Sequence, residues 1–90
     1  QRDAAPLLYR TLKEMANAIK AGERDYAKLI TAAQAQHSAA GLRPDYLEVR
    51  EANGLRPATA DDRHLVILVA AFTGNTRLID NLAFELDTPT

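Results

Sequence analysis

The two histidines of this 90-residue chain, His37 and His64, are the first candidates for catalysis or metal binding. Neither has a carboxylate beside it at the spacing that metal ligands use. Ser38 is the only serine and adjoins His37, but neighbouring helix positions point in different directions, so the pair is not a nucleophile with its base. We therefore interpret both histidines as surface or boundary residues.

A cluster of polar residues near the C-terminus is a second candidate, because Asp80 falls among the apolar positions of a predicted strand. A bare carboxylate on an apolar face is unfavourable, so Asp80 should have a partner. One interpretation is structural: Asp80 pairs with Arg50 or Arg77, or accepts hydrogen bonds from backbone N–H groups. The other is functional, a contact with a neighbouring domain or its ligand. The cluster comprises Arg50, Arg77, Asp80 and Asn81.

The sequence shows neither a phosphate-binding loop nor a thiol site. Its four glycines are isolated from one another, and each is explained by a helix end or a turn. The chain has no cysteine, which removes disulfides, thiolate nucleophiles and cysteine metal ligands. We therefore assign no catalytic, cofactor-binding or metal-binding residue to this chain.

Two helices are predicted in the N-terminal half. Apolar residues recur at helical spacing over residues 5–21, with a start near Asp3 and Pro6 and a stop at Gly22. A second helix is predicted from an N-cap at Asp25 to a stop at Gly41. The connection is so short that the helices must lie antiparallel and side by side. The apolar stripe of the first helix consists of Leu8, Leu12, Met15 and Ile19.

Three strands are predicted in the C-terminal half. After Pro44, Leu47 and Val49 alternate with polar residues, which is the period of a strand with one buried face. Residues 64–72 form a nearly continuous apolar run, typical of a central strand covered on both faces. A tight turn over 73–76 leads into a third strand over 77–86. Residues 55–63 are predicted as a loop with room for one short helical turn.

Helices followed by strands predict an α+β fold, a two-layer sandwich with a helical hairpin packed on a three-stranded antiparallel β-sheet. Residues 1–90 would form a single domain. If the helices cover one face of the sheet, the apolar central strand needs a cover on the other, which a missing domain would supply. Gln1 stands close to the predicted helix in place of a methionine, so we expect a segment of a longer chain. The tail beyond Asp87 is expected to fray.

The charge pattern disfavours two kinds of partner. The net charge is −1, and the basic residues are interleaved with acidic ones, so the chain lacks the electrostatic footprint of a nucleic-acid-binding protein. The longest apolar run, residues 65–72, is too short to cross a membrane as a helix. We expect a cytoplasmic protein that binds neither nucleic acid nor a membrane.

Two stretches of this sequence resemble the C-terminal domain of the pantothenate synthetase family. They are residues 45–51, with the run Tyr-Leu-Glu-Val-Arg, and residues 68–81, with the run Thr-Arg-Leu-Ile-Asp-Asn. The run Ala-Gly-Glu-Arg-Asp at 21–25 stands between the two predicted helices, in the order that the family shows. Glu51 departs from the aspartate that commonly follows the arginine. The resemblance covers nearly the whole chain.

This resemblance implies a function that the chain does not perform alone. Enzymes of the family use ATP and Mg²⁺ to condense pantoate with β-alanine, and their nucleotide-binding motifs precede the segment equivalent to this one. The chain would then be a lid on an N-terminal Rossmann-like domain, inactive by itself and without a bound cofactor, and the full enzyme would be a homodimer. The alternative is a free-standing α+β module for interaction or ligand binding, because folds of this size host many functions.

Overall fold

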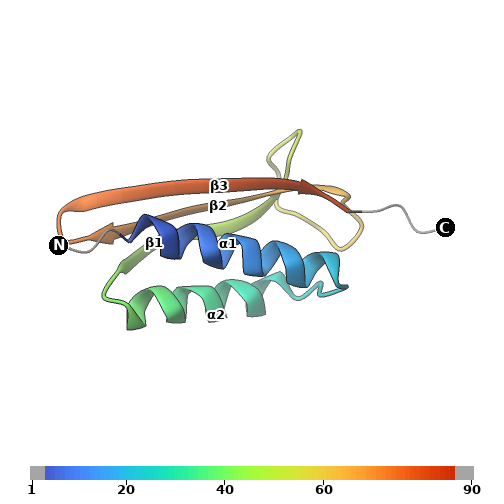
Figure 1. Cartoon of the computed structure of the whole chain (residues 1–90). Coiled ribbons are helices and arrows are strands. Elements are labelled where there is room, and N and C mark those ends of the chain that lie inside the picture. The colour runs from blue at the N-terminus through green and yellow to red at the C-terminus, as the bar shows by residue number, and fades with distance from the viewer. Residues whose placement is uncertain (1–3, 87–90) are drawn as a thin grey trace.

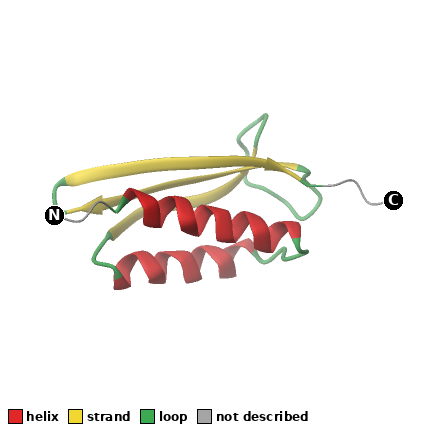
Figure 2. Cartoon of the chain, viewed as in Figure 1, coloured by secondary structure: helices red, strands yellow, loops and turns green. Residues whose placement is uncertain are grey.

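The computed structural model describes residues 4–86 and contains two helices followed by three strands. Helices α1 (Ala5–Lys20) and α2 (Tyr26–Ala39) form an antiparallel hairpin below the sheet (Figure 1). Figure 2 shows the same two layers, with both helices on one face of the strands. The predicted α+β sandwich is therefore confirmed. Asp3 and the tail beyond Asp87 lie outside the described residues.

The sheet consists of β1 (Arg43–Glu51), β2 (His64–Thr73) and β3 (Thr76–Glu85) in the order β1-β2-β3. Both pairings are antiparallel, which confirms β2 as the central strand. β1 begins at Arg43, before the predicted start, and its register shifts between Pro44 and Tyr46. A bulge at this edge strand accommodates Pro44, which has no N–H to donate.

The helix ends follow the signals in the sequence. The Asp25 side chain accepts a hydrogen bond from the backbone N–H of Lys28 at 3.1 Å, so the predicted N-cap is confirmed. Gly22 and Gly41, just beyond the two helices, have φ values of 118° and 92°. These left-handed conformations end a helix without a Cβ clash.

The core lies between the hairpin and one face of the sheet, which we call the inner face. β1 contributes Leu47 and Val49 to this core, and β2 contributes Leu65, Ile67 and Val69. The predicted stripe of α1 packs against them, with Leu12 and Ile19 at 0% exposure. The opposite side of the sheet, the outer face, carries Tyr46, Glu48, Arg50, Val66, Leu68, Ala70, Phe72, Arg77, Ile79 and Asn81.

The connection between β1 and β2 consists of turns and extended segments. Residues 52–63 contain no helical residue, so the short helical turn that the sequence allowed is not formed. The first part of the connection, residues 52–56, rises from the outer face of the sheet, away from the helices (Figure 1), and we call it the raised loop. The chain then returns beside β1, where Pro57 bridges to Arg50 and the Ala58 N–H donates to the Val49 carbonyl at 3.1 Å. A wall therefore stands at one end of the outer face.

Candidate functional site

The predicted polar cluster is divided between two edge strands. Arg50 lies on β1 and the other three residues lie on β3, with β2 between them. Along the register, Arg50 is opposite Val66, which is opposite Ala83, whereas Arg77 is opposite Phe72. Arg50 and Arg77 therefore lie toward opposite ends of the sheet, and the four residues do not form a single site.

Arg50 is fixed by its own strand and by the following loop. Its Nε and Nη2 donate to Glu48 Oε1 at 2.9 and 2.8 Å, and its Nη1 donates to the Leu55 carbonyl at 2.6 Å. Both charged side chains point to the outer face because residues two apart on a strand share a face. The charges of Glu48 and Arg50 neutralise each other, and the bond from Arg50 to the Leu55 carbonyl ties the raised loop to β1.

Arg77 lies at the other end of the outer face. Its Nε donates to Asp45 Oδ2 at 3.0 Å, and its guanidinium lies over the Tyr46 ring at 5.6 Å. Arg43 lies in the same way over Phe72, at 4.9 Å. Two arginines therefore cover two aromatic rings beside the β2–β3 turn.

Asp80 points to the inner face, opposite Val69, and is half-buried. Arg50 and Arg77 both lie on the outer face, so the predicted pairing of Asp80 with either arginine is wrong. The other structural option is formed, because Asp80 Oδ1 accepts the backbone N–H of Asn81 at 2.8 Å. Asn81 itself is exposed on the outer face.

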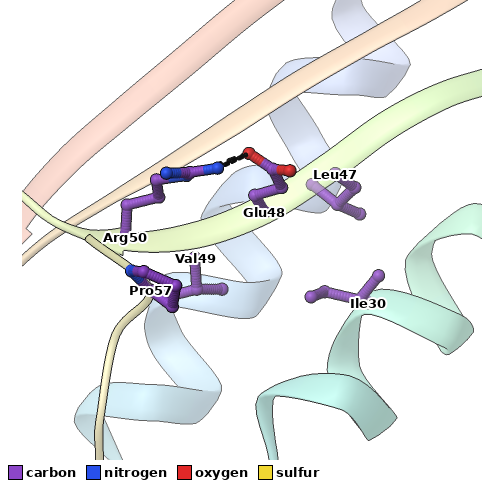
Figure 3. A pocket seen from close by; sticks show the side chains of 6 residues that line it. All are labelled: Ile30, Leu47, Glu48, Val49, Arg50 and Pro57. Atoms are coloured by element: carbon purple, nitrogen blue, oxygen red, sulfur yellow. Dashed lines mark hydrogen bonds and ion pairs between the residues drawn. The ribbon is translucent and has the colours of Figure 1, made fainter. Parts of the chain in front are cut away.

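A hollow of about 220 Å³ opens at the free edge of β1, between α2 and the returning loop. Figure 3 shows Ile30 of α2 facing Leu47 and Val49, with Pro57 beside Val49 and the Glu48–Arg50 pair above them. Its floor is apolar and its charged pair is already satisfied. The hollow is suited to an apolar group and offers no unpaired acid or base for catalysis.

A second hollow, of about 310 Å³, lies on the outer face. Its lining combines the sheet with the raised loop: Tyr46, Glu48, Arg50, Leu55 and Leu68. The Glu48–Arg50 pair thus borders both hollows. Of the predicted cluster, Arg50 lines both of these hollows.

The raised loop is held by carboxylates that the sequence analysis did not single out. Glu51 Oε1 accepts the N–H groups of Gly54 and Asn53 at 2.6 and 3.0 Å, and these bonds lower its pKa. Arg56 donates to both oxygens of Asp62 at 2.8 and 2.6 Å. This guanidinium, followed by the N–H of Thr59, holds the pKa of Asp62 well below its usual range.

Acid should therefore loosen this loop, and Asp62→Asn should reduce the effect. A carboxyl whose folded pKa is depressed stabilises the fold fully above its unfolded pKa, about 3.9, and loses this contribution as the pH falls toward the folded value. We expect Asp62→Asn to lower the stability at neutral pH and to reduce acid-linked proton uptake on unfolding by about one proton. Urea unfolding across a pH series measures both.

Asp61→Asn is the matched control for that series. Asp61 is the neighbouring exposed residue, and it takes part in the loop through its backbone N–H, which donates to Thr59 Oγ1 at 3.4 Å. If the two variants show the same acid dependence, the Arg56–Asp62 bridge does not hold the loop.

The predicted surface position of His37 is wrong. His37 is 0% exposed in the helical hairpin, where its Nε2 lies 2.8 Å from Thr11 Oγ1. Burial lowers the pKa of its imidazole. The adjacent Ser38 is exposed, so the two side chains do point apart as predicted. His64 is exposed, as predicted, and its Nδ1 lies 3.4 Å from Glu85 Oε2.

The described residues show no arrangement for metal chemistry, since over residues 4–86 no group of three or more His, Cys, Asp and Glu side chains converges. In the same part of the chain, no helix is both long and apolar enough to cross a membrane. What the structure offers is an apolar outer face with a loop wall and paired charges. Such a surface is suited to contact with another apolar surface.

A sequence model described as pantoate-beta-alanine ligase matches residues 1–83. The chain is 65% identical over 89 residues to a pantothenate synthetase of Pseudomonas fluorescens strain Pf-5, covering 99% of this chain and 31% of that protein. It is 62% identical over 90 residues to a pantothenate synthetase of Pseudomonas putida strain W619, again covering 31% of it. The chain thus spans about a third of these relatives' length.

Solved structures agree with these relatives. A crystal structure of the pantothenate synthetase of Thermus thermophilus superposes with a TM-score of 0.74 at 32% identity, covering 87% of this chain and 28% of that one. Fold and sequence therefore define a two-layer α+β segment of an enzyme family. The chain belongs to the pantoate-beta-alanine ligase family.

Proposed function

We propose that this chain is the C-terminal domain of an ATP-dependent ligase that condenses pantoate with β-alanine. The family match over residues 1–83 supports this proposal more strongly than any other observation. It favours the ligase over a free-standing α+β module. In the proposed reaction, pantoate and ATP give a pantoyl adenylate and pyrophosphate. The β-alanine amine then displaces AMP to form pantothenate.

In this proposal the chain acts as a lid rather than as a catalyst. The groups that bind ATP and Mg²⁺ belong to an N-terminal Rossmann-like domain, with which the chain forms a cytoplasmic enzyme, a homodimer in its full form. Closing over the adenylate would exclude water, which would otherwise hydrolyse this activated intermediate. The paired charges of the outer face are compatible with a surface that repeatedly opens and closes.

The 90-residue chain alone should therefore form no pantothenate from ATP, Mg²⁺, pantoate and β-alanine. The full-length protein should form pantothenate and AMP in equal amounts, and deletion of this segment should lower that rate by about a hundredfold or more. Chromatographic assay of both products measures the three samples. Turnover by the isolated chain, or full activity without it, would overturn the proposed division of labour.

A further inference from the structure

The outer face of the sheet presents apolar side chains to water between its charged ones. Ile79 is 62% exposed on β3 and Leu55 is 50% exposed on the raised loop. Between them lie the half-buried side chains of Tyr46 and Leu68, because Ile79 and Tyr46 both flank Ala70 across the sheet and Leu55 lines a hollow with Tyr46 and Leu68. The helices cover only the inner face (Figure 2). A contiguous apolar surface of this kind marks an interaction site.

The loop wall is built to hold one apolar side chain in place. Leu55 has a φ of 59°, a left-handed conformation that a leucine rarely adopts. Its N–H donates to the Glu51 carbonyl at 2.8 Å, and its carbonyl accepts from Arg50 at 2.6 Å. Such conformations persist where the surroundings enforce them, and they gather at binding sites. Leu55 therefore forms a fixed side of the 310 Å³ hollow.

The charges on this face indicate the chemistry of its partner. Arg50 is paired with Glu48, and Arg77 with Asp45. Arg43 donates to the Gly74 carbonyl at 3.0 Å and stacks on Phe72. Because each of these three arginines already has an interaction partner within the chain, this face does not favour a strongly acidic partner. It fits a mainly apolar protein surface with a polar rim.

Resting on the proposed function, we infer that the outer face is the surface that packs against the remainder of the full-length protein. An apolar side chain of that remainder fills the hollow between Leu55 and Leu68. The chain spans 31% of its relatives' length, so most of the polypeptide lies outside it and is tethered to it. A tethered partner has a high effective concentration, which favours it over a second copy of this chain.

Thiol labelling of two positions tests which face is covered. The segment has no cysteine, so Ile79→Cys and Tyr9→Cys each introduce one thiol, on the outer face and on α1. The native side chains are 62% and 48% exposed, which makes them a matched pair. Maleimide modification is followed by peptide mass in the 90-residue chain and in the full-length protein. We expect labelling at position 79 to be about tenfold slower in the full-length protein, and labelling at position 9 to be unchanged.

Three results would overturn this inference. They are protection at position 9 instead of 79, protection at neither position, and labelling at position 79 that slows with concentration in the 90-residue chain. The last would identify a second copy as the occupant. Adding ATP, Mg²⁺ and pantoate separates this inference from the proposed function. Suppose that position 79 is protected equally with and without these ligands, and that the protein forms no pantothenate. The interface would then stand, and the proposal of a ligase lid would be refuted.

Discussion

Replacing Ile67 with alanine is expected to lower the free energy of unfolding of the 90-residue chain by about 2–5 kcal/mol, because it leaves a cavity in the core. Ile67 lies on the inner face of the central strand and is 0% exposed. A domain of this size has a total stability of about 5–15 kcal/mol, so the variant should be partly unfolded near physiological temperature. Urea unfolding followed by far-UV circular dichroism measures the loss.

The adjacent residue provides the control, because Leu68 is half-buried on the outer face. Leu68→Ala should destabilise the isolated chain by only about 1 kcal/mol, since water already reaches this side chain. In the full-length protein the loss should increase as the remainder covers the outer face. Equal losses for Ile67→Ala and Leu68→Ala in the isolated chain would contradict the assignment of inner and outer faces.

The elements of this fold could be predicted because their signals are local. The stripe of α1 is buried as its spacing predicts, with Leu12 and Ile19 at 0% and Met15 at 4% exposure. The apolar run of β2 became the central strand. Hydrophobic periodicity reports which side of an element faces the core without reference to the rest of the chain. For the same reason, it could not indicate that β1 begins at Arg43 or that its register shifts between Pro44 and Tyr46.

The burial of His37 was missed although a signal existed. His37 follows Ala33 by four residues, so it continues the buried side of α2. Its polarity led to the interpretation as a surface residue. Its partner, Thr11, is 26 residues away in sequence and meets it only because the two helices pack as a hairpin. Such a pair depends on how two helices are packed, which the spacing within either helix does not specify.

The partners of the arginines were mispredicted for a related reason. Arg50 and Asp80 are both polar residues in strands where polar and apolar residues alternate, but the register places the two side chains on opposite faces of the sheet. Face assignment across strands requires the position of the bulge and the turn. A shift of one residue exchanges the two faces. The carboxylates used instead, Glu48 and Asp45, are supplied by β1.

Replacing Thr11 with valine is expected to destabilise the chain by about 1–3 kcal/mol, because it leaves a buried polar group without a partner. The Thr11 hydroxyl lies 2.9 Å from the Leu8 carbonyl oxygen and 2.8 Å from His37 Nε2, so it is the hydrogen-bond partner of that ring nitrogen. The buried Nδ1 has no hydrogen-bond partner among residues 4–86. Without the hydroxyl, both ring nitrogens would be unsatisfied.

The control is a double-mutant cycle, because His37→Leu removes the polar group that Thr11→Val leaves unsatisfied. Thr11→Val combined with His37→Leu should be less destabilised than the sum of the single variants by about 1 kcal/mol or more. Additive losses would show that the two side chains do not interact.

The pH dependence gives the same cycle a second measurement. Burial lowers the pKa of His37, so at a pH between the lower folded pKa and the unfolded value of about 6.5 the unfolded chain binds more of this proton than the folded chain does. Stability should therefore decline as the pH falls from about 6.5 toward the lower folded pKa, and His37→Leu should remove this part of the decline. Because the imidazole is buried inside the hairpin, its protonation favours the unfolded chain, in which the helical layer no longer covers the inner face of the sheet.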